Sequence, residues 1–271
     1  MKHLTSLLLL LSLSPLCLFA GDGPQLKSAA KPRDIKWSHE ADTEIGYTAT
    51  SDLKQGDAKV GQFASVNSSA SYVATGKFEK DFLGRFGVGW NRYSFGINNA
   101  LRVPNTLQSV SLTTGFDFSV GDKWLFRFEA QPGIYGDFDE VNSNQFNVPL
   151  IFGGTYFVNE KFQLFFGVFV DFFGNPYYGL GIKDDFPVFP AVGFRWQITD
   201  DLVFMALPPK PRLTYSITDT LSIYGGGQLL GGSFRTSPNF GNNTGDPRLN
   251  DSLVDYSEIR GGVGLGWNVT P

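Results

Sequence analysis

From about Glu44 onward, apolar and polar residues alternate along the chain with a period of two. In residues 107–120, for example, Val110, Leu112 and Phe116 alternate with residues that are mostly Ser, Thr or Asp. A sustained period of two is typical of β-strands whose two faces meet different surroundings. The pattern predicts about 12 strands, near 44–51, 64–78, 85–95, 107–120, 124–135, 146–158, 162–173, 188–198, 202–207, 212–217, 221–234 and 254–269.

Short turns and long links alternate between these strands. The short turns share one template, an apolar residue, three polar residues and a second apolar residue: Val120–Trp124, Val158–Phe162, Ile198–Leu202 and Ile217–Leu221. The longer links are rich in Gly, Asn, Asp and Pro: 51–62, 96–106, 136–145, 174–187 and 235–253. This alternation places the short turns at one end and the long loops at the other, as in outer-membrane barrels. The sequence therefore predicts an all-β fold, an antiparallel, up-and-down transmembrane β-barrel.

A secreted β-sandwich also has alternating strands and is the alternative to a barrel. The polar face carries mostly Gly, Ser, Asn and Gln with isolated charges, which fits a confined, hydrated interior better than an open surface. Aromatic residues also gather next to the short turns, where they would form a ring at one membrane interface. This predicted interface ring comprises Phe118, Trp124, Tyr156, Phe162, Trp196 and Trp267.

Residues 1–20 have the features of a secretory signal peptide, with a short basic start and an apolar run that ends before Ala20. Residues 21–43 show no apolar period and are predicted to be a mobile N-terminal segment, which leaves 44–271 for the barrel. The one cysteine, Cys17, lies in the leader, so the mature chain would have no thiol chemistry. We expect a protein of the bacterial outer membrane, in contact with its lipid and with the machinery that assembles barrels.

Composition narrows the class further. Hydrophobic residues make up 42% of the 271 residues and charged residues only 18%, with 26 Phe and 32 Gly. This aromatic-rich profile excludes intrinsic disorder and a coiled coil. The net charge of −4 offers no strongly basic surface for phosphate groups, so nucleic acid is not an expected partner.

The sequence offers little for catalysis. Its two histidines are His3 in the leader and His39 in the predicted N-terminal segment, so a Ser-His-Asp site held by the barrel is not expected. No Cys or His cluster indicates a metal site, and we expect no cofactor and no enzymatic activity. The acidic loop residues Asp137, Asp139 and Glu140 could bind a divalent cation but are interpreted as solvated charges.

Six charged residues fall on the polar face of the predicted strands and are candidates for lining the lumen: Arg127, Glu129, Asp171, Arg195, Glu258 and Arg260. In an open channel, such charges select which solutes pass. In a closed barrel, they pair with one another and fill the lumen. The equal numbers of basic and acidic residues favour pairing. Barrel width does not decide, because about 12 strands lie between filled and open barrels.

Five motifs occur in an order similar to that of a bacterial outer-membrane β-barrel family of unknown function: Phe146-Asn147-Val148-Pro149, Phe173-Gly174-Asn175-Pro176, Leu207-Pro208-Pro209-Lys210-Pro211, Asp219-Thr220-Leu221-Ser222-Ile223-Tyr224 and Tyr256-Ser257-Glu258-Ile259-Arg260. The turn Gly121-Asp122-Lys123-Trp124 is similar as well. The resemblance spans roughly 60–271 and implies an exported barrel. It implies no substrate and no catalytic residue.

The end of the chain departs from the pattern of outer-membrane barrels, whose last strand usually ends in an aromatic residue. This chain stops at Asn268-Val269-Thr270-Pro271. Either Trp267 is the closing aromatic residue or a further hairpin is missing, and we favour a missing hairpin, which predicts about 14 strands for the complete barrel. The expected function is porin-like passage of a small solute through a narrow, charged lumen. The alternative is a closed barrel with a structural or surface-interaction role.

Overall fold

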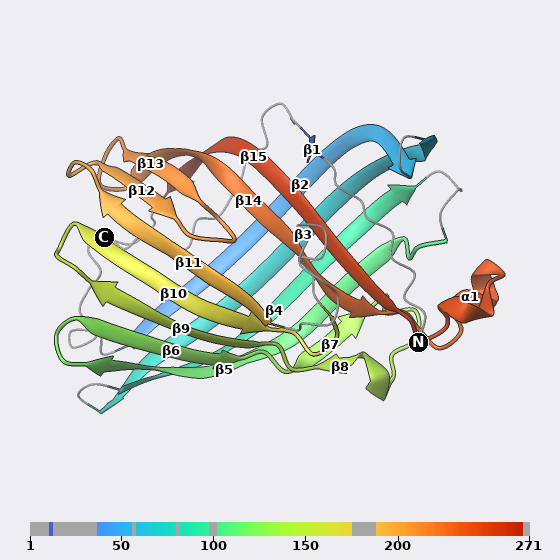
Figure 1. The fold of residues 1–271 in the computed structure, drawn as a ribbon, viewed down its shortest axis with the longest axis horizontal. Helices are drawn as coiled ribbons and strands as arrows, with labels where there is room; N and C mark the ends of the chain where they lie inside the picture. Colours follow the sequence, from blue (N-terminus) through green and yellow to red (C-terminus); the bar gives the residue numbers. More distant parts are fainter. Residues whose placement is uncertain are drawn as a thin grey trace.

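The computed structural model describes residues 11–12, 37–55, 58–79, 82–97, 102–174 and 188–267. It is nearly all β, with 71% strand and 5% helix. The strands are β1 (Leu11–Ser12), β2 (Trp37–Gln55), β3 (Ala58–Glu79), β4 (Phe82–Ile97), β5 (Thr106–Val120), β6 (Trp124–Ala130), β7 (Gly133–Gly136), β8 (Phe146–Asn147), β9 (Leu150–Phe157), β10 (Phe162–Val170), β11 (Val188–Gln197), β12 (Leu202–Ala206), β13 (Arg212–Ser216), β14 (Leu221–Arg235) and β15 (Leu253–Trp267) (Figure 1). Three helical segments are described, η2 (Ser143–Gln145), α1 (Phe240–Thr244) and η4 (Pro247–Leu249).

Hydrogen bonds connect the strands into one sheet in the order β2-β3-β4-β5-β6-β9-β10-β11-β12-β13-β14-β15-β1. The strand β7 pairs with both β5 and β14, and this closes a ring of nine strands from β5 through β6 and β9 to β14. The strands β4, β3 and β2 continue the sheet beyond β5, and β15 continues it beyond β14. The predicted β-barrel is therefore present. From β2 to β15, strands that follow one another in this order pair antiparallel, as short connections require.

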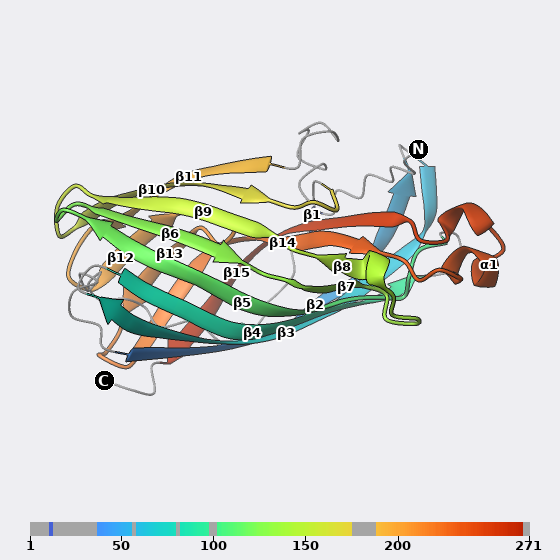
Figure 2. The ribbon, with the colours of Figure 1, turned by 90° about the horizontal axis from the view of Figure 1, so that it is seen from below.

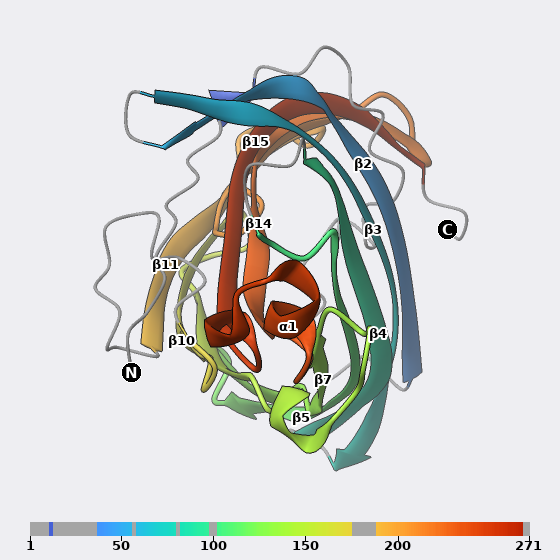
Figure 3. The same cartoon turned by 90° about the vertical axis from the view of Figure 1, so that its right-hand side faces the viewer.

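The connections divide the barrel into two ends (Figures 1 and 2). The short-turn end carries the tight turns between β5 and β6, β9 and β10, β11 and β12, and β13 and β14. In two of these turns the backbone N–H of Ile198 and Ile217 donates to the carbonyl oxygen of Leu202 and Leu221, each at 2.8 Å. The long-loop end carries α1, η2 and η4, and α1 lies in front of the ring of strands when the barrel is viewed from that end (Figure 3).

Side chains inside the barrel link the two ends of the sheet order. The Thr48 Oγ1 of β2 donates to the Glu258 Oε1 of β15 at 2.8 Å, and Arg260 of β15 donates to Asn67 of β3. Gln228 of β14 donates to both carboxylate oxygens of Glu44 on β2, at 3.0 and 3.2 Å. Side chains of β2 and β3 therefore contact side chains of β14 and β15 in the interior.

The first strand begins earlier than the alternation predicts. Strand β2 starts at Trp37, so residues 37–43 belong to the sheet and not to a mobile N-terminal segment. The predicted long link 51–62 is also wrong, because β2 continues to Gln55 and β3 starts at Ala58. Both errors have one cause. The outward face of β2 is apolar only at scattered positions such as Trp37, Ile45 and Tyr47, so the alternation is weak, and pairing with β3 along the strand holds the segment extended.

Two predicted strands are each divided in two by a proline. The predicted strand 124–135 becomes β6 and β7 on either side of Gln131-Pro132, and 146–158 becomes β8 and β9 around Val148-Pro149. Proline has no N–H group to donate to a neighbouring strand, so the ladder breaks there. With β1, the described residues form a sheet of 15 strands instead of about 12.

Part of the sequence-based interpretation lies outside the described residues. Of the predicted leader, only Leu11 and Ser12 are described. Residues 21–36, 175–187 and 268–271 are not described. The further hairpin that the sequence predicts at the end of the barrel therefore stays a prediction. In the part of the chain that the structure does describe, no helix is both long and apolar enough to cross a bilayer.

Candidate functional site

The interior of the barrel is more polar than its exterior. Among the described residues, 25 buried residues are polar or charged and only 8 are hydrophobic, whereas 30 large hydrophobic residues are exposed. On β5, Ser109, Ser111 and Thr113 are buried, while Val110 and Leu112 are 50% and 59% exposed. A water-soluble protein places its apolar residues the other way round. The alternation along the strands therefore separates an apolar outer face from a polar interior.

One group of interior charges joins β4, β5 and β6. The guanidinium of Arg127 donates two bonds of 2.9 Å to the two carboxylate oxygens of Asp117. The guanidinium of Arg85 donates to Glu129 at 3.3 Å and lies 3.9 Å from Asp117. Arg85, Asp117 and Glu129 are buried. Arg127 and Glu129, two of the predicted lumen residues, are thus linked through Arg85 and Asp117. The sequence analysis missed both of these linking residues.

A second group lies on β15. Arg260 Nε donates to Glu258 Oε1 at 2.7 Å and Arg260 Nη2 donates to Glu258 Oε2 at 2.9 Å. The same Arg260 Nη2 donates to Thr48 Oγ1 at 3.1 Å, and Tyr256 donates its hydroxyl to Glu258. Both charged residues are at most 5% exposed. Glu258 and Arg260 are therefore a buried ion pair with hydrogen-bonding neighbours, as the pairing interpretation predicts.

The other two predicted lumen residues are also buried. Asp171 follows β10, and its Oδ1 accepts from Asn147 Nδ2 at 2.7 Å and from the backbone N–H of Phe173 at 3.0 Å. Arg195 is buried on β11, where its Cα pairs with that of Gln163 on β10. All six predicted residues thus lie on the inward face, but Arg127 keeps 43% of its side chain exposed.

The hairpin of β12 and β13 places a further cation inside the barrel. Lys210 lies in the Pro-rich turn between these strands, and its Nζ is 2.9 Å from Glu44 Oε2 on β2. This turn lies against the middle of β14, where the backbone N–H of Gly227 and of Leu229 donates to Pro211 and Pro209. The two strands have five residues each, which is shorter than the roughly 9–11 that span a membrane.

An aromatic plug fills the interior at the long-loop end. We use this name for Tyr93, Phe95, Leu107, Phe234 and Tyr256, which come from β4, β5, β14 and β15. Ring centroids of Tyr93 lie 5.9 Å from Phe234 and 5.1 Å from Tyr256, and Phe95 lies 5.0 Å from Tyr256. Leu107 is 1% exposed at the centre of this cluster. These side chains therefore pack against one another in the interior at this end.

A glycine with a positive φ lies in β14 close to the plug residue Phe234. Gly231 has a φ of 149°, a backbone conformation that residues other than glycine rarely adopt. A Cβ atom at this position would lie 2.1 Å from the carbonyl oxygen of Tyr256. Beyond this glycine, β14 pairs with β7 through Arg235 and Gly136. Strand β14 stays paired with β15 on both sides of this glycine, through Phe234 and Arg235.

The loop between β14 and β15 lies at the long-loop end and is bonded to the loop that follows β7, the strand that pairs with the end of β14. Asp137 after β7 accepts from the backbone N–H of Ser237 at 2.8 Å and from Gln145 Nε2 at 3.3 Å. Asn239 donates to Glu140 at 2.9 Å. Asp137 and Glu140 therefore hold loops together, and the described residues contain no group of three or more His, Cys, Asp or Glu side chains that could hold a metal.

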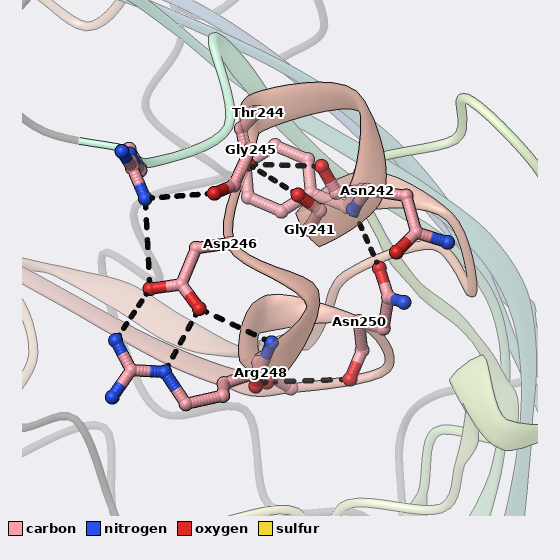
Figure 4. Close-up of polar contacts among 10 residues, drawn as sticks. Gly241, Asn242, Thr244, Gly245, Asp246, Arg248 and Asn250 are labelled. Atoms are coloured by element: carbon pink, nitrogen blue, oxygen red, sulfur yellow. Dashed lines mark hydrogen bonds and ion pairs between the residues drawn. The ribbon is translucent and has the colours of Figure 1, made fainter.

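The tip of this loop is ordered by its own contacts (Figure 4). Arg248 donates to the two carboxylate oxygens of Asp246 at 2.8 and 2.7 Å, and Arg102 donates to the carbonyl oxygen of Gly245 at 3.2 Å. The hydrogen bond from Arg248 lowers the pKa of Asp246 to about 2. The same pair raises the pKa of Arg248. Asp246 and Arg248 at the loop tip are therefore both charged over the physiological pH range.

The predicted interface ring lies on the outer face near the short turns. Trp124 and Tyr156 are Cα partners on neighbouring strands with ring centroids 4.6 Å apart, and Phe162 and Trp196 are also Cα partners. Phe118 stacks on Phe126 at 5.2 Å. The register therefore pairs Trp124 with Tyr156 and Phe162 with Trp196, while Phe118 lies two residues from Val120, the partner of Trp124. The side chain of Trp267 lies outside the described part.

His39 does not lie outside the strands, as the sequence analysis expects, but on β2. Its Nδ1 is 2.7 Å from the Tyr72 hydroxyl, and the two rings stack at 6.0 Å. The contact is exposed on the outer face, on the opposite side of β2 from Glu40 and Asp42. His39 therefore does not face the interior carboxylates.

No protein-family model matches the chain, and no curated protein sequence is similar to it. The site described above therefore rests on the geometry of this barrel alone.

Proposed function

We propose that the protein is an integral outer-membrane β-barrel whose lumen is closed at the long-loop end in its resting state. The observation that carries this proposal is the inverted distribution of residues, with an apolar outer face around a polar interior. In a bilayer, the exposed Val, Leu and Phe side chains face lipid and the paired interior charges are removed from it. The aromatic residues near the short turns would sit at one interface.

In this proposal the wall of the barrel has twelve segments, in which β6 with β7 and β8 with β9 each count as one; β12 and β13 belong to the wall but are too short to span the membrane. Strands β2 and β15 would close the barrel by pairing antiparallel, because β2 runs toward the long-loop end and β15 runs away from it. The bond between Thr48 and Glu258 and the bond between Arg260 and Asn67 support this closure. A closed barrel leaves no unpaired strand edge in lipid.

Two features favour a closed resting state over an open pore. The aromatic plug lies in the interior at the long-loop end, and the loop between β14 and β15 is bonded to Asp137 and Glu140 of the loop after β7. The charges below the plug are paired, as in Arg127 with Asp117 and Arg260 with Glu258. A structural or surface-interaction role is therefore the function that this geometry supports best.

Passage of small solutes is the second candidate, and a cavity of about 320 Å³ in the interior favours it. Transport along the axis would require the plug to move. The proposal also keeps three expectations from the sequence. These are membership of an outer-membrane barrel family of unknown function, contact with the assembly machinery, and no enzymatic activity.

Planar-bilayer conductance of residues 21–271 tests the proposal. The protein is refolded in detergent and first checked for heat-modifiable migration and for flotation with lipid vesicles. We expect the wild type to be silent, and we expect conductance steps when 238–250 is replaced by a short Gly-Ser linker in a Phe234→Ala background. Phe146→Ala, an exposed change at the same end, is the control and should stay silent.

Each result has a defined meaning. Steady conductance of the wild type would overturn the closed state and favour solute passage. A plug variant that stays silent would favour a purely structural barrel. Failure of the folded wild type to float with vesicles would overturn the membrane location.

A further inference from the structure

Aromatic rings cover part of the outer face of the barrel near the short turns. Phe116 lies 5.2 Å from Phe82 and 6.1 Å from Phe118, measured between ring centroids. Phe126 continues the contacts to Phe118 at 5.2 Å and to Trp124 at 5.7 Å, and Trp124 lies 5.8 Å from Phe166. We call this continuous surface the outer aromatic patch; its residues come from β4, β5, β6 and β10: Phe82, Phe116, Phe118, Trp124, Phe126 and Phe166.

Glycines of the outer face let rings lie against the sheet here. A Cβ atom at Gly84 on β4 would lie 2.1 Å from the ring of Phe78, and a Cβ atom at Gly154 on β9 would lie 2.3 Å from the ring of Phe166. Rings that lie on the backbone give a smoother surface than rings that stand away from it. The patch is therefore suited to close contact with another smooth surface.

The outer face of β13, β14 and β15 is built differently. Its exposed residues are mainly aliphatic, such as Leu213, Ile223 and Leu265. Among the described residues, the atom nearest to a Cβ at Gly225 or Gly227 of β14 is 3.6 Å away, so these glycines are not covered by a ring. Both sides of the barrel would meet the same lipid in the proposed location. Lipid alone therefore does not account for the aromatic side.

A second protein surface accounts for it better. Lipid tails are as apolar as leucine, so two membrane proteins associate only where they pack more closely on each other than on lipid. Aromatic rings are rigid and gain from stacked and edge-on contacts with other rings. The outer face from β4 to β11 is five strand spacings wide, about 24 Å, and Thr114–Val120 rises about 20 Å. Two such faces would bury about 1,000 Å², which is enough for a specific interface.

We propose that the protein forms a two-fold symmetric homodimer in the membrane through the outer aromatic patch, with β6 close to the axis. Strand β6 lies in the middle of the patch, and its three successive outward positions Trp124, Phe126 and Phe128 are all aromatic. A two-fold interface joins the same patch on both copies, so a surface of rings is its own partner. Val110 and Leu112 lie above the patch on β5 and stay in contact with lipid. The dimer rests on the membrane location proposed above and goes beyond it.

Single-molecule photobleaching in lipid vesicles tests the dimer. Residues 21–271 carry one dye on Thr220→Cys, in the exposed turn between β13 and β14, and the protein is diluted in lipid until chance pairs are rare. We expect two bleaching steps for most particles. Flotation of the same vesicles shows separately whether the protein is in the membrane.

Substitutions assign the contact to the patch. Phe116→Leu, Phe126→Leu and Phe166→Leu together keep the face apolar but remove three rings, and they should weaken dimerisation by about tenfold or more. The matched control changes one outward residue on each of three strands of the opposite side, Leu213→Ala, Ile223→Ala and Leu265→Ala. This control should dimerise like the wild type.

Cross-linking locates the axis without removing a ring. Ala130 is the next outward position of β6 after Phe128. A short bismaleimide should link two copies of Ala130→Cys in vesicles, and it should not link copies of Leu213→Cys on β13.

Other outcomes overturn the proposal. One bleaching step at all dilutions in vesicles that float would leave the patch to lipid, and three steps would contradict two-fold pairing. Dimerisation that the three Phe→Leu changes leave intact, or cross-linking at Leu213 in place of Ala130, would place the contact elsewhere. If the triple variant does not fold by heat-modifiable migration, the Ala130 and Leu213 comparison decides. Failure to float would overturn the membrane location itself, so the two failures are distinguishable.

Discussion

The interior of the barrel contains two regions that are built differently. At the long-loop end, the aromatic plug packs rings and Leu107 together with few polar contacts. On its short-turn side, the polar network of Arg85, Glu129 and their partners fills the space with ion pairs, and a cavity remains. The plug is held by shape and burial, whereas the network is held by directional bonds.

This difference determines how each region responds to a lost side chain. Removal of an apolar group from the plug leaves a void whose cost grows with its volume. Removal of one partner from a buried ion pair leaves a charge without compensation, which costs more than the pair contributes. The two regions should therefore differ in how much stability is lost when a side chain is removed. They should also differ in how this loss depends on the exposure of that side chain.

The largest effect is expected at Arg260. Arg260→Met leaves Glu258 buried without its cation and removes the bond to Asn67, so we expect a loss of about 3–5 kcal/mol in the free energy of unfolding. Urea unfolding in detergent, followed by tryptophan fluorescence, measures it. Arg127→Met is the matched comparison and should cost about 1 kcal/mol or less, because Arg127 is 43% exposed and Arg85 stays near Asp117. Equal costs would contradict the distinction between buried and exposed pairs.

The plug should give the next largest effect. Phe234→Ala removes a ring that is 2% exposed and packs on Tyr93, so we expect a loss of about 3 kcal/mol in the free energy of unfolding. The same urea titration measures it, with the exposed Phe146→Ala as control. If Phe234→Ala costs no more than this control, the plug does not stabilise the barrel.

The smallest effect is expected at the loop tip and depends on pH. In the folded protein the pKa of Asp246 is about 2, below its ordinary value of about 3.9. The ionised carboxylate therefore stabilises the loop tip fully above about pH 4. This stabilisation is lost as the pH falls toward 2, because the carboxylate becomes protonated. Hydrogen exchange of the 236–252 segment, corrected for the intrinsic pH dependence, should show this loss.

Asp246→Asn separates charge from shape in this measurement. Asp246 is the N-cap of η4, and asparagine caps a helix about as well as aspartate. The variant should therefore keep the segment folded but lose the response to pH. A response that the variant retains would assign it to another group.

The apolar outer face and the charged interior follow from the period of two. Apolar residues alternate with polar residues or glycine along residues 126–129 of β6 and 192–197 of β11, so the inward position of Glu129 or Arg195 can be read from parity alone. The proline breaks at Pro132 and Pro149 could also have been anticipated, because proline cannot donate in a ladder. The full extent of β2 could not, because apolar residues such as Trp37 and Ile45 are scattered along its outward face and pairing with β3 holds it extended.

The contacts between distant strands could not be predicted from the sequence. Leu107 shares its parity with Ser109 and Ser111, which marks an apolar residue on the inward face. Nothing in the local pattern shows that it meets Phe234, which is far away in the chain. The same holds for Lys210 and Glu44, whose contact depends on where the short β12–β13 hairpin ends.

The central claim is that the apolar face of the strands meets lipid. Spin labels on single cysteines along β5 test it most directly, because the chain has no cysteine after Cys17. In vesicles, labels at Val110 and Leu112 should collide with oxygen dissolved in lipid, and labels at Ser109, Ser111 and Thr113 should be shielded from it. If labels at Val110 and Leu112 collide instead with a water-soluble nickel complex, the outer face is in water and the membrane barrel is contradicted.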